Sequence, residues 1–164
     1  MIAVKYKIRI AREEDLPQVL RIYAYARGFM AANGNPNQWG TTNPPRETLE
    51  GDIAEQKLYV AVKEGMICGV FFFDIGEDPT YHKIYDGAWL SDATYGTIHR
   101  IASLGSGGIF AACVDFCLQK CSHLRIDTHG DNHIMQHVVE KNGFQRRGII
   151  YIADGTPRIA YERI

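Results

Sequence analysis

A chain of 164 residues, 46% of them hydrophobic and 23% charged, has the size and composition of one soluble domain with its own core, which we take as residues 1–164. The formal net charge of −1 and the pI near 6.6 provide no basic field for nucleic acid. No apolar run approaches the roughly 18 residues that suggest a membrane span, and the N-terminal residues lack the apolar core of a signal peptide. We therefore expect a cytoplasmic protein whose partners are neither nucleic acid nor membranes.

Two sets of potential metal ligands recur at a spacing of four residues: Cys113, Cys117 and Cys121, then His129, His133 and His137. For the cysteines, we favour a row of small apolar side chains on the core side of a helix. His129 is expected to precede the helix that carries the other two histidines, and no carboxylate completes a zinc-protease motif. We therefore expect reduced thiols, solvated or capping histidines, and no metal.

The first half of the chain predicts a strand, two helices and a β-hairpin. Residues 5–10 alternate charged and apolar side chains, as a half-buried strand does. Apolar residues then recur at helical spacing over 13–32, and a shorter amphipathic helix is expected over 46–56. Residues 57–63 and 67–74 are rich in β-forming residues on either side of a short turn, which indicates the hairpin.

The segment 33–45 between the two helices is a long loop with three of the six prolines. A loop of this length inside a compact domain is usually functional or disordered. Trp39 is its one large apolar side chain. Trp39 either forms an aromatic wall for a small substrate or pins the loop to the core.

The second half begins with an irregular segment over 75–94, broken by glycine and proline and containing at most a short helical turn. Asp131 is the expected N-cap of the last helix, and Asn142-Gly143 is its expected end. The predicted elements are a strand over 95–102, a helix from about Ile109, a strand over 123–128, a helix over 132–141, and strands over 144–152 and 158–164.

The stretch Ser103–Gly108, SLGSGG, joins a strand to a helix. Its glycines allow a sharp turn and leave main-chain N–H groups unshielded by a Cβ atom. With the positive end of the helix dipole behind them, these groups form a candidate phosphate or pyrophosphate site. The alternative is a flexible surface connection.

The order of expected elements, β-α-α-β-β-β-α-β-α-β-β, the glycine loop, and the segment from Asn132 to Gly143-Phe144 together resemble the GNAT superfamily of acetyl-CoA-dependent N-acetyltransferases. The resemblance covers about residues 5–164. It implies an α/β fold of mixed α+β type, with a central mixed, mostly antiparallel sheet of about seven strands flanked by four helices.

The resemblance implies acetyl-CoA as co-substrate. The loop would hold the coenzyme pyrophosphate on backbone amides, the splayed strand before it would bond the pantetheine, and Asn132 would contact the pantetheine end. The implied coenzyme-binding residues are Ile101, Ala102, Ser103, Leu104, Gly105, Ser106, Gly107, Gly108, Ile109 and Asn132.

Three positions depart from the family pattern. If Gly108 is the first family glycine, Gly105 stands where glutamine or arginine is usual, and Phe110 stands where a small residue is usual. The family's frequent general acid is a tyrosine seven residues after the asparagine, but position 139 is Val139. Tyr151 on the following strand, or a water, would then protonate the leaving thiolate.

His99 is the predicted general base, because it lies on the strand that would carry the thioester and its ordinary pKa of about 6.5 suits proton acceptance near pH 7. A branch of the family that acts on aryl amines resembles this arrangement. The alternative is a packed strand histidine. Asp74 and Glu77 are alternative bases that would also suit a cationic substrate.

Trp39, Asp74 and His129 are the predicted substrate-binding residues. His129 and Asp131 follow the strand over 123–128, where open α/β sheets place ligands, although helix capping also explains them.

We therefore expect an N-acetyltransferase that moves an acetyl group from acetyl-CoA to a primary amine of a small molecule or peptide by direct attack. The alternatives are a GNAT-like protein that binds acyl-CoA without turnover, and a small nucleotide- or flavin-binding α/β module. A homodimer is possible through the last strand.

Overall fold

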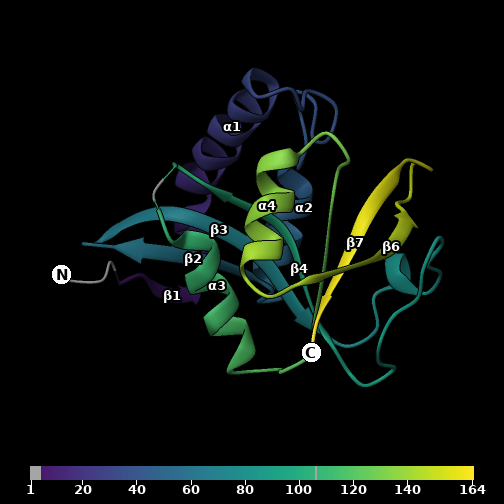
Figure 1. Ribbon diagram of the computed structural model, residues 1–164. Coiled ribbons are helices and arrows are strands. Elements are labelled where there is room, and N and C mark those ends of the chain that lie inside the picture. The colour runs from purple at the N-terminus through teal and green to yellow at the C-terminus, as the bar shows by residue number, and fades with distance from the viewer. Residues whose placement is uncertain (1–4, 106) are drawn as a thin grey trace.

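The computed structural model describes residues 5–105 and 107–164, and over these residues it is a seven-stranded mixed sheet with four α-helices (Figure 1). The strand order is β1-β2-β3-β4-β5-β7-β6, and every neighbouring pair is antiparallel except β4 with β5. The elements are β1 (Lys7–Ile10), α1 (Leu16–Ala32), α2 (Arg46–Ala54), β2 (Leu58–Lys63), β3 (Met66–Ile75), β4 (Gly96–Ser103), α3 (Ile109–Leu118), β5 (Leu124–Thr128), α4 (His133–Lys141), β6 (Gln145–Tyr151) and β7 (Pro157–Arg163), with 3₁₀ turns at Glu13–Asp15 and Pro79–Tyr81.

This architecture confirms the predicted fold and the predicted order of elements. The doubly wound nucleotide- or flavin-binding alternative is wrong, because it requires alternating βα units and a parallel sheet, whereas this sheet is mostly antiparallel. The predicted irregular segment over 75–94 contains a single short helical turn at Pro79–Tyr81.

The predicted N-cap of α4 is wrong by one residue. Asn132 caps the helix, because its Oδ1 accepts a hydrogen bond from Met135 N at 3.0 Å. Asp131 is exposed, and its backbone N–H donates to Nδ1 of His129 at 3.0 Å. Asn and Asp cap helices about equally well, so composition alone did not separate the two positions.

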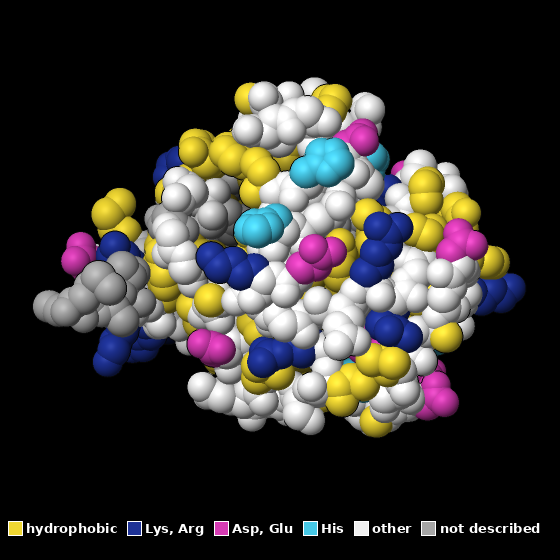
Figure 2. Space-filling view, in the orientation of Figure 1, with side chains coloured by type: hydrophobic (Ala, Val, Ile, Leu, Met, Phe, Trp, Pro, Cys, Tyr) yellow, Lys and Arg dark blue, Asp and Glu magenta, His cyan; other side chains and the backbone are white. Residues whose placement is uncertain are grey.

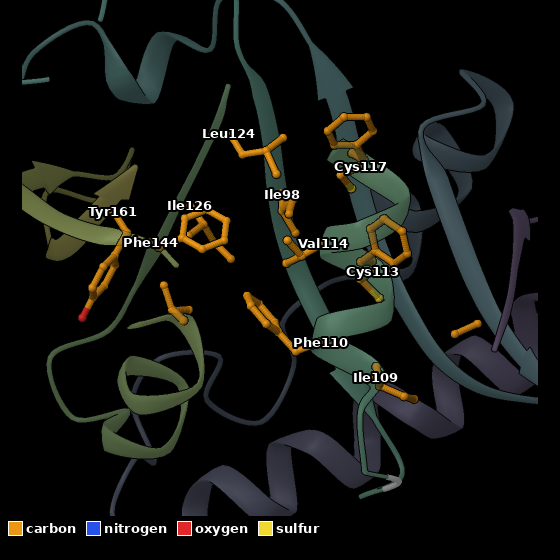
Figure 3. Packing of buried hydrophobic residues seen from close by; sticks show 14 of the residues in the cluster. Ile98, Ile109, Phe110, Cys113, Val114, Cys117, Leu124, Ile126, Phe144 and Tyr161 are labelled. Carbon is orange, nitrogen blue, oxygen red and sulfur yellow. The ribbon is translucent and has the colours of Figure 1, made fainter. Parts of the chain in front are cut away.

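Helices α1 and α2 cover one face of the sheet, and α3 and α4 cover the other (Figure 1). On the α3 face, Cys113 and Cys117 are fully buried, as predicted for small apolar side chains, and burial raises the pKa of the Cys117 thiol to about 12. Figure 3 shows Phe110 pointing into this core. Its ring lies 6.2 Å from the ring of Phe144, so it packs in the core beneath α3.

The two central strands splay apart. Strands β4 and β5 are parallel and form two residue pairs, Gly96 with Leu124 and Thr97 with Arg125. Among the described residues, β4 has no pair with β5 after Thr97. On its other edge, β4 has a bulge opposite β3, at which Arg100 adopts a φ of 51°. Tyr23 of α1 donates a hydrogen bond to the Arg100 carbonyl at 2.7 Å. The second half of β4 is therefore held open on the side that faces β5.

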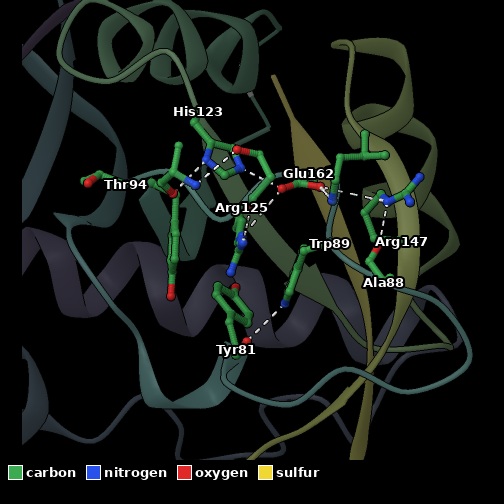
Figure 4. Close-up of polar contacts among 12 residues, drawn as sticks. Tyr81, Ala88, Trp89, Thr94, His123, Arg125, Arg147 and Glu162 are labelled. Atoms are coloured by element: carbon green, nitrogen blue, oxygen red, sulfur yellow. Dashed lines mark hydrogen bonds and ion pairs between the residues drawn. The ribbon is translucent and has the colours of Figure 1, made fainter.

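The segment between β3 and β4 is fastened to the sheet by the fully buried carboxylate of Glu162 on β7 (Figure 4). Glu162 accepts a hydrogen bond from Leu90 N at 2.6 Å and lies 2.6 Å from Nε2 of His123. The guanidinium of Arg125 lies 4.0 Å from the ring centre of Trp89, which belongs to the same segment. An irregular segment thus acquires a defined position, because its backbone and one aromatic ring are bound to buried charges.

No helix among the residues that the structure describes is long and apolar enough to cross a membrane.

Candidate active site

A cavity of about 400 Å³ opens along the splayed half of β4, between α1, α3 and α4. Most of the predicted coenzyme-binding residues line it: Ile101, Ala102, Ser103, Gly105, Gly107, Gly108, Ile109 and Asn132. Leu104 is not part of this lining, and Ser106 lies outside the described residues. The splayed half of β4 and the glycine loop therefore line the same cavity, which we call the loop cavity.

The N-terminus of α3 presents its amides to the loop cavity. Gly108 is the N-cap and has a φ of 80°, a left-handed conformation that glycine adopts without strain. Tyr6 donates a hydrogen bond to the Gly107 carbonyl at 2.7 Å, which fixes the approach to the helix. The first-turn N–H groups of a helix have no partner within it, so they are available to an anion.

The described residues that line the loop cavity include no lysine or arginine. Attraction for a phosphate would therefore depend on the backbone amides and the helix dipole. The rest of the lining is largely apolar and comes from α1 and α4, with Tyr25, Phe29 and Ile134 each about half exposed. Figure 2 shows hydrophobic side chains gathered over α1 and histidines over α4 on this face of the molecule.

A second cavity of about 470 Å³ adjoins the first, and we call it the histidine cavity. The two cavities share four lining residues: Met30, Ile101, Asn132 and Met135. Trp39 and His99 both line the histidine cavity. The ring of Trp39 also packs edge-on against Tyr23, with the centroids 5.5 Å apart, so Trp39 both pins its loop to α1 and forms a wall.

His99 lies between two carboxylates. Its Nε2 is 2.8 Å from Oδ2 of Asp78, and its Nδ1 is 3.8 Å from Oδ2 of Asp127. Phe72 packs beside the ring, at 5.6 Å between centroids. One carboxylate therefore orients the imidazole, while a second negative charge lies near its other nitrogen.

The pKa values of this cluster reflect its burial and its contacts. Burial by itself would raise the pKa of Asp78, but the hydrogen bond and charge of His99 and the hydrogen bonds from Thr80 outweigh it and lower the pKa to about 2. Tyr81 donates a hydrogen bond to Oδ2 of Asp127 at 2.6 Å. Burial and the Asp127 charge raise the pKa of Tyr81 well above its usual value, so this hydroxyl keeps its proton.

Asn132 lies where the two cavities meet. Its Oδ1 caps α4, while its Nδ2 donates to Oε1 of Gln38 at 2.9 Å. Gln38 belongs to the same loop as Trp39. Asn132 thus connects the start of α4 to the loop that walls the histidine cavity.

Three of the predicted catalytic and substrate-binding residues do not line either cavity. Asp74 is half exposed on β3 and forms an ion pair with Lys57 at 3.1 Å. His129 accepts a hydrogen bond from the backbone N–H of Asp131 in the turn before α4, whereas the cap of α4 is Asn132. Tyr151 packs its ring against Tyr85, with the centroids 5.3 Å apart, because side chains alternate along β6 and the preceding Ile150 faces the core.

Sequence reasoning missed three charged residues of the site. Asp127 lies near the carboxyl end of β5, and the rule that pointed to His129 applies equally to Asp127. Asp78 lies in the irregular segment and Arg158 near the start of β7, and no motif marks either residue.

No family model and no curated protein sequence matches the chain. Among solved structures, it is similar to a GNAT-family acetyltransferase from Streptococcus agalactiae, at 28% identity and a TM-score of 0.88 over 99% of this chain and 98% of the other. This similarity supports a GNAT superfamily acetyltransferase.

Two further solved structures, at lower identity, share the fold. An aminoglycoside N(6')-acetyltransferase from Legionella pneumophila has 14% identity and a TM-score of 0.69, with 99% of this chain and 94% of the other covered. A ribosomal-protein-alanine N-acetyltransferase from Brucella melitensis has 18% identity and a TM-score of 0.64, with 96% and 99% covered. The Streptococcus agalactiae structure, at 28% identity, supports acetyl transfer as the general chemistry.

Proposed function

We propose that this GNAT protein transfers the acetyl group of acetyl-CoA to a primary amine of a small molecule or peptide by direct attack in a ternary complex. The observation that carries the proposal is the meeting of two cavities at Ile101 and Asn132. One cavity offers free helix amides to a phosphate, and the other contains a histidine oriented by a carboxylate. A reaction between two bound molecules needs two such sites in contact.

In this proposal the coenzyme occupies the loop cavity. Its pyrophosphate lies on the amides that follow Gly108, and its pantetheine follows the open edge of β4 at Ile101 and Ala102. Those two residues lie beyond the last β5 pair, so their edge of β4 is free to bond a ligand. The thioester then lies at the junction of the two cavities.

The acceptor occupies the histidine cavity. Asp78 and Asp127 attract a protonated amine, and His99 takes the proton that the amine must lose. The nitrogen forms a bond to the thioester carbonyl carbon, the carbon–sulfur bond breaks, and coenzyme A leaves as a thiolate. Asp78 holds the imidazole in one orientation.

The leaving thiolate takes its proton from a water. Val139 occupies the position of the family tyrosine and is fully buried, and Tyr151 packs against Tyr85 instead of lining either cavity. A general acid typically raises the rate of a reaction about 10²–10⁴-fold. Because a thiolate is a fairly good leaving group, the reaction without a side-chain acid loses only part of this rate enhancement.

The test is thiol release from acetyl-CoA measured over a panel of primary amines, with mass spectrometry of the acetylated products. We expect coenzyme binding by calorimetry and amine-dependent release of coenzyme A. Tight coenzyme binding with no turnover on any amine would favour the acyl-CoA-binding alternative. The presence of Val139 in place of the family tyrosine is consistent with that alternative. Failure to bind acetyl-CoA would overturn both.

A further inference from the structure

Arg158 is a buried cation on the wall of the histidine cavity. It is 6% exposed and lies on β7, far along the chain from His99 on β4. Its Nη1 donates hydrogen bonds to Thr156 Oγ1 at 3.0 Å and to the Pro157 carbonyl at 2.9 Å. These bonds hold the guanidinium by one nitrogen and fix its orientation.

The opposite edge of the guanidinium is open. Within residues 5–105 and 107–164, the Nε and Nη2 atoms of Arg158 donate no hydrogen bond, and no carboxylate oxygen lies within 4.0 Å of the side chain. Nε of Arg100 is fully buried and has no hydrogen-bond partner. Nε and Nη2 of Arg158 are not fully buried in this way. The Nε–Nη2 edge of Arg158 is therefore unpaired but accessible.

The two arginines that line the histidine cavity differ in their partners. Arg100 forms an ion pair with Asp52 on α2. Arg158 receives only the longer-range attraction of Asp127 and Asp154, and burial is the main cause that lowers its pKa. A guanidinium remains charged even so, and a buried charge without a direct partner is costly. An anion brought by a ligand would remove that cost.

We propose that the acetyl acceptor carries a carboxylate as well as its amine, and that Arg158 binds this carboxylate. The Nε–Nη2 edge has two parallel N–H groups, the geometry that pairs bidentately with a planar carboxylate. One unit of positive charge matches one carboxylate, because Arg100 is already neutralised by Asp52. A phosphate dianion would require a second unpaired cation, whereas Arg100, the other arginine of the described lining, is already paired with Asp52.

The charges of the cavity match such a molecule at both ends. Asp78 and Asp127 surround His99 and suit an ammonium group, while Arg158 provides the positive region. An amino acid or a similar zwitterion would place opposite charges at the two regions. This inference rests on the proposed function, because it assigns the substrate class of the same cavity.

The experiment compares matched acceptors that differ in one group: an amino acid, its carboxamide and the corresponding decarboxylated amine. We expect a value of kcat/KM that is about 10- to 100-fold higher for the carboxylate-bearing member, the range of a hydrogen bond to a charged group. Arg158→Gln should abolish this preference, mainly by raising KM for the amino acid. Arg158→Lys should restore part of it. Arg21→Gln, an exposed arginine on α1 that bonds to Gln18, is the control.

Calorimetric binding of the same compounds to the complex with coenzyme A separates this inference from the proposed function. Weaker amino-acid binding in Arg158→Gln supports the inference even without turnover. Acetylation of all three acceptors at equal rates, with Arg158→Gln indistinguishable from wild type, would overturn the inference and leave the acetyltransferase assignment intact. If Arg158→Gln does not fold, the wild-type preference among the three acceptors decides the question.

Discussion

Nε2 of His99 lies 2.8 Å from Oδ2 of Asp78, and this contact joins a residue of the central strand β4 to one in the irregular segment before it. The imidazole is thereby oriented within the histidine cavity and held beside a negative charge. The segment that supplies Asp78 is itself bound to the sheet through Glu162. Catalysis by His99 would thus depend on this loop and on the buried carboxylate of Glu162, which lines neither cavity.

Replacing His99 tests its role as base. We expect His99→Ala to lower kcat/KM about 100-fold at pH 7 and by less at pH 9, because more of the amine is already neutral at the higher pH. Asp78→Asn should cause a smaller loss through poorer orientation of the imidazole. His137→Ala, on an exposed position of α4, is the control. An equal loss at both pH values would rule out the role.

Replacing Gly108 tests the placement of the pyrophosphate. Valine is strained at a φ of 80° and brings a β-branched side chain to the start of α3, so Gly108→Val should weaken acetyl-CoA binding at least about 10-fold. Gly65→Val is matched to it, because Gly65 has a φ of 76° in the β2–β3 turn and lines neither cavity. Both variants should lose stability, but only the first should raise the dissociation constant by calorimetry. Unchanged affinity in Gly108→Val would show that the pyrophosphate binds elsewhere.

The lowered pKa of Asp78 predicts a pH-dependent contribution to stability. The pKa of the Asp78 carboxyl is about 2 in the folded protein, below its ordinary value of 3.8, so ionised Asp78 stabilises the fold at and above pH 5. This contribution, about 2 kcal/mol, should be lost as the pH falls from about 4 to about 2. Urea unfolding of wild type and Asp78→Asn should therefore give free energies that differ near neutrality and converge in acid. A difference that persists to the lowest pH would contradict the assignment.

Glu162 is predicted to hold the segment that carries Asp78. Glu162→Gln leaves His123 and Arg125 without their buried anion, and we expect the free energy of unfolding to fall by about 3 kcal/mol. Transfer activity of the remaining folded protein should fall as well. Glu64→Gln, in an exposed turn, should change the free energy of unfolding by less than about 0.5 kcal/mol in the same urea titration. A loss no larger than that of the control would exclude the fastening role.

Much of the fold could be predicted from the sequence, because periodicity and turn residues act locally. The alternation over residues 5–10 and the helical spacing over 13–32 place β1 and α1, although β1 begins two residues later, at Lys7. The glycines of Ser103–Gly108 mark the turn into α3, and the element order indicates the superfamily. Element ends were less secure, as Asn132 rather than Asp131 at the start of α4 shows.

The site depended on contacts between distant segments. His99 and Trp39 were predicted separately, but only the folded chain brings them into one cavity with Arg158 from β7. The direction of a side chain was equally undetermined, since Phe110 turns into the core and Tyr151 turns toward Tyr85.

The sequence by itself determined the elements, their order, the glycine turn and the apolar face of α3. The tertiary structure decided the splay of β4 from β5, the carboxylates around His99 and the open edge of Arg158. The reason is physical: local conformation depends on neighbours in the chain, whereas the charge state and orientation of a buried group depend on whichever segments pack around it.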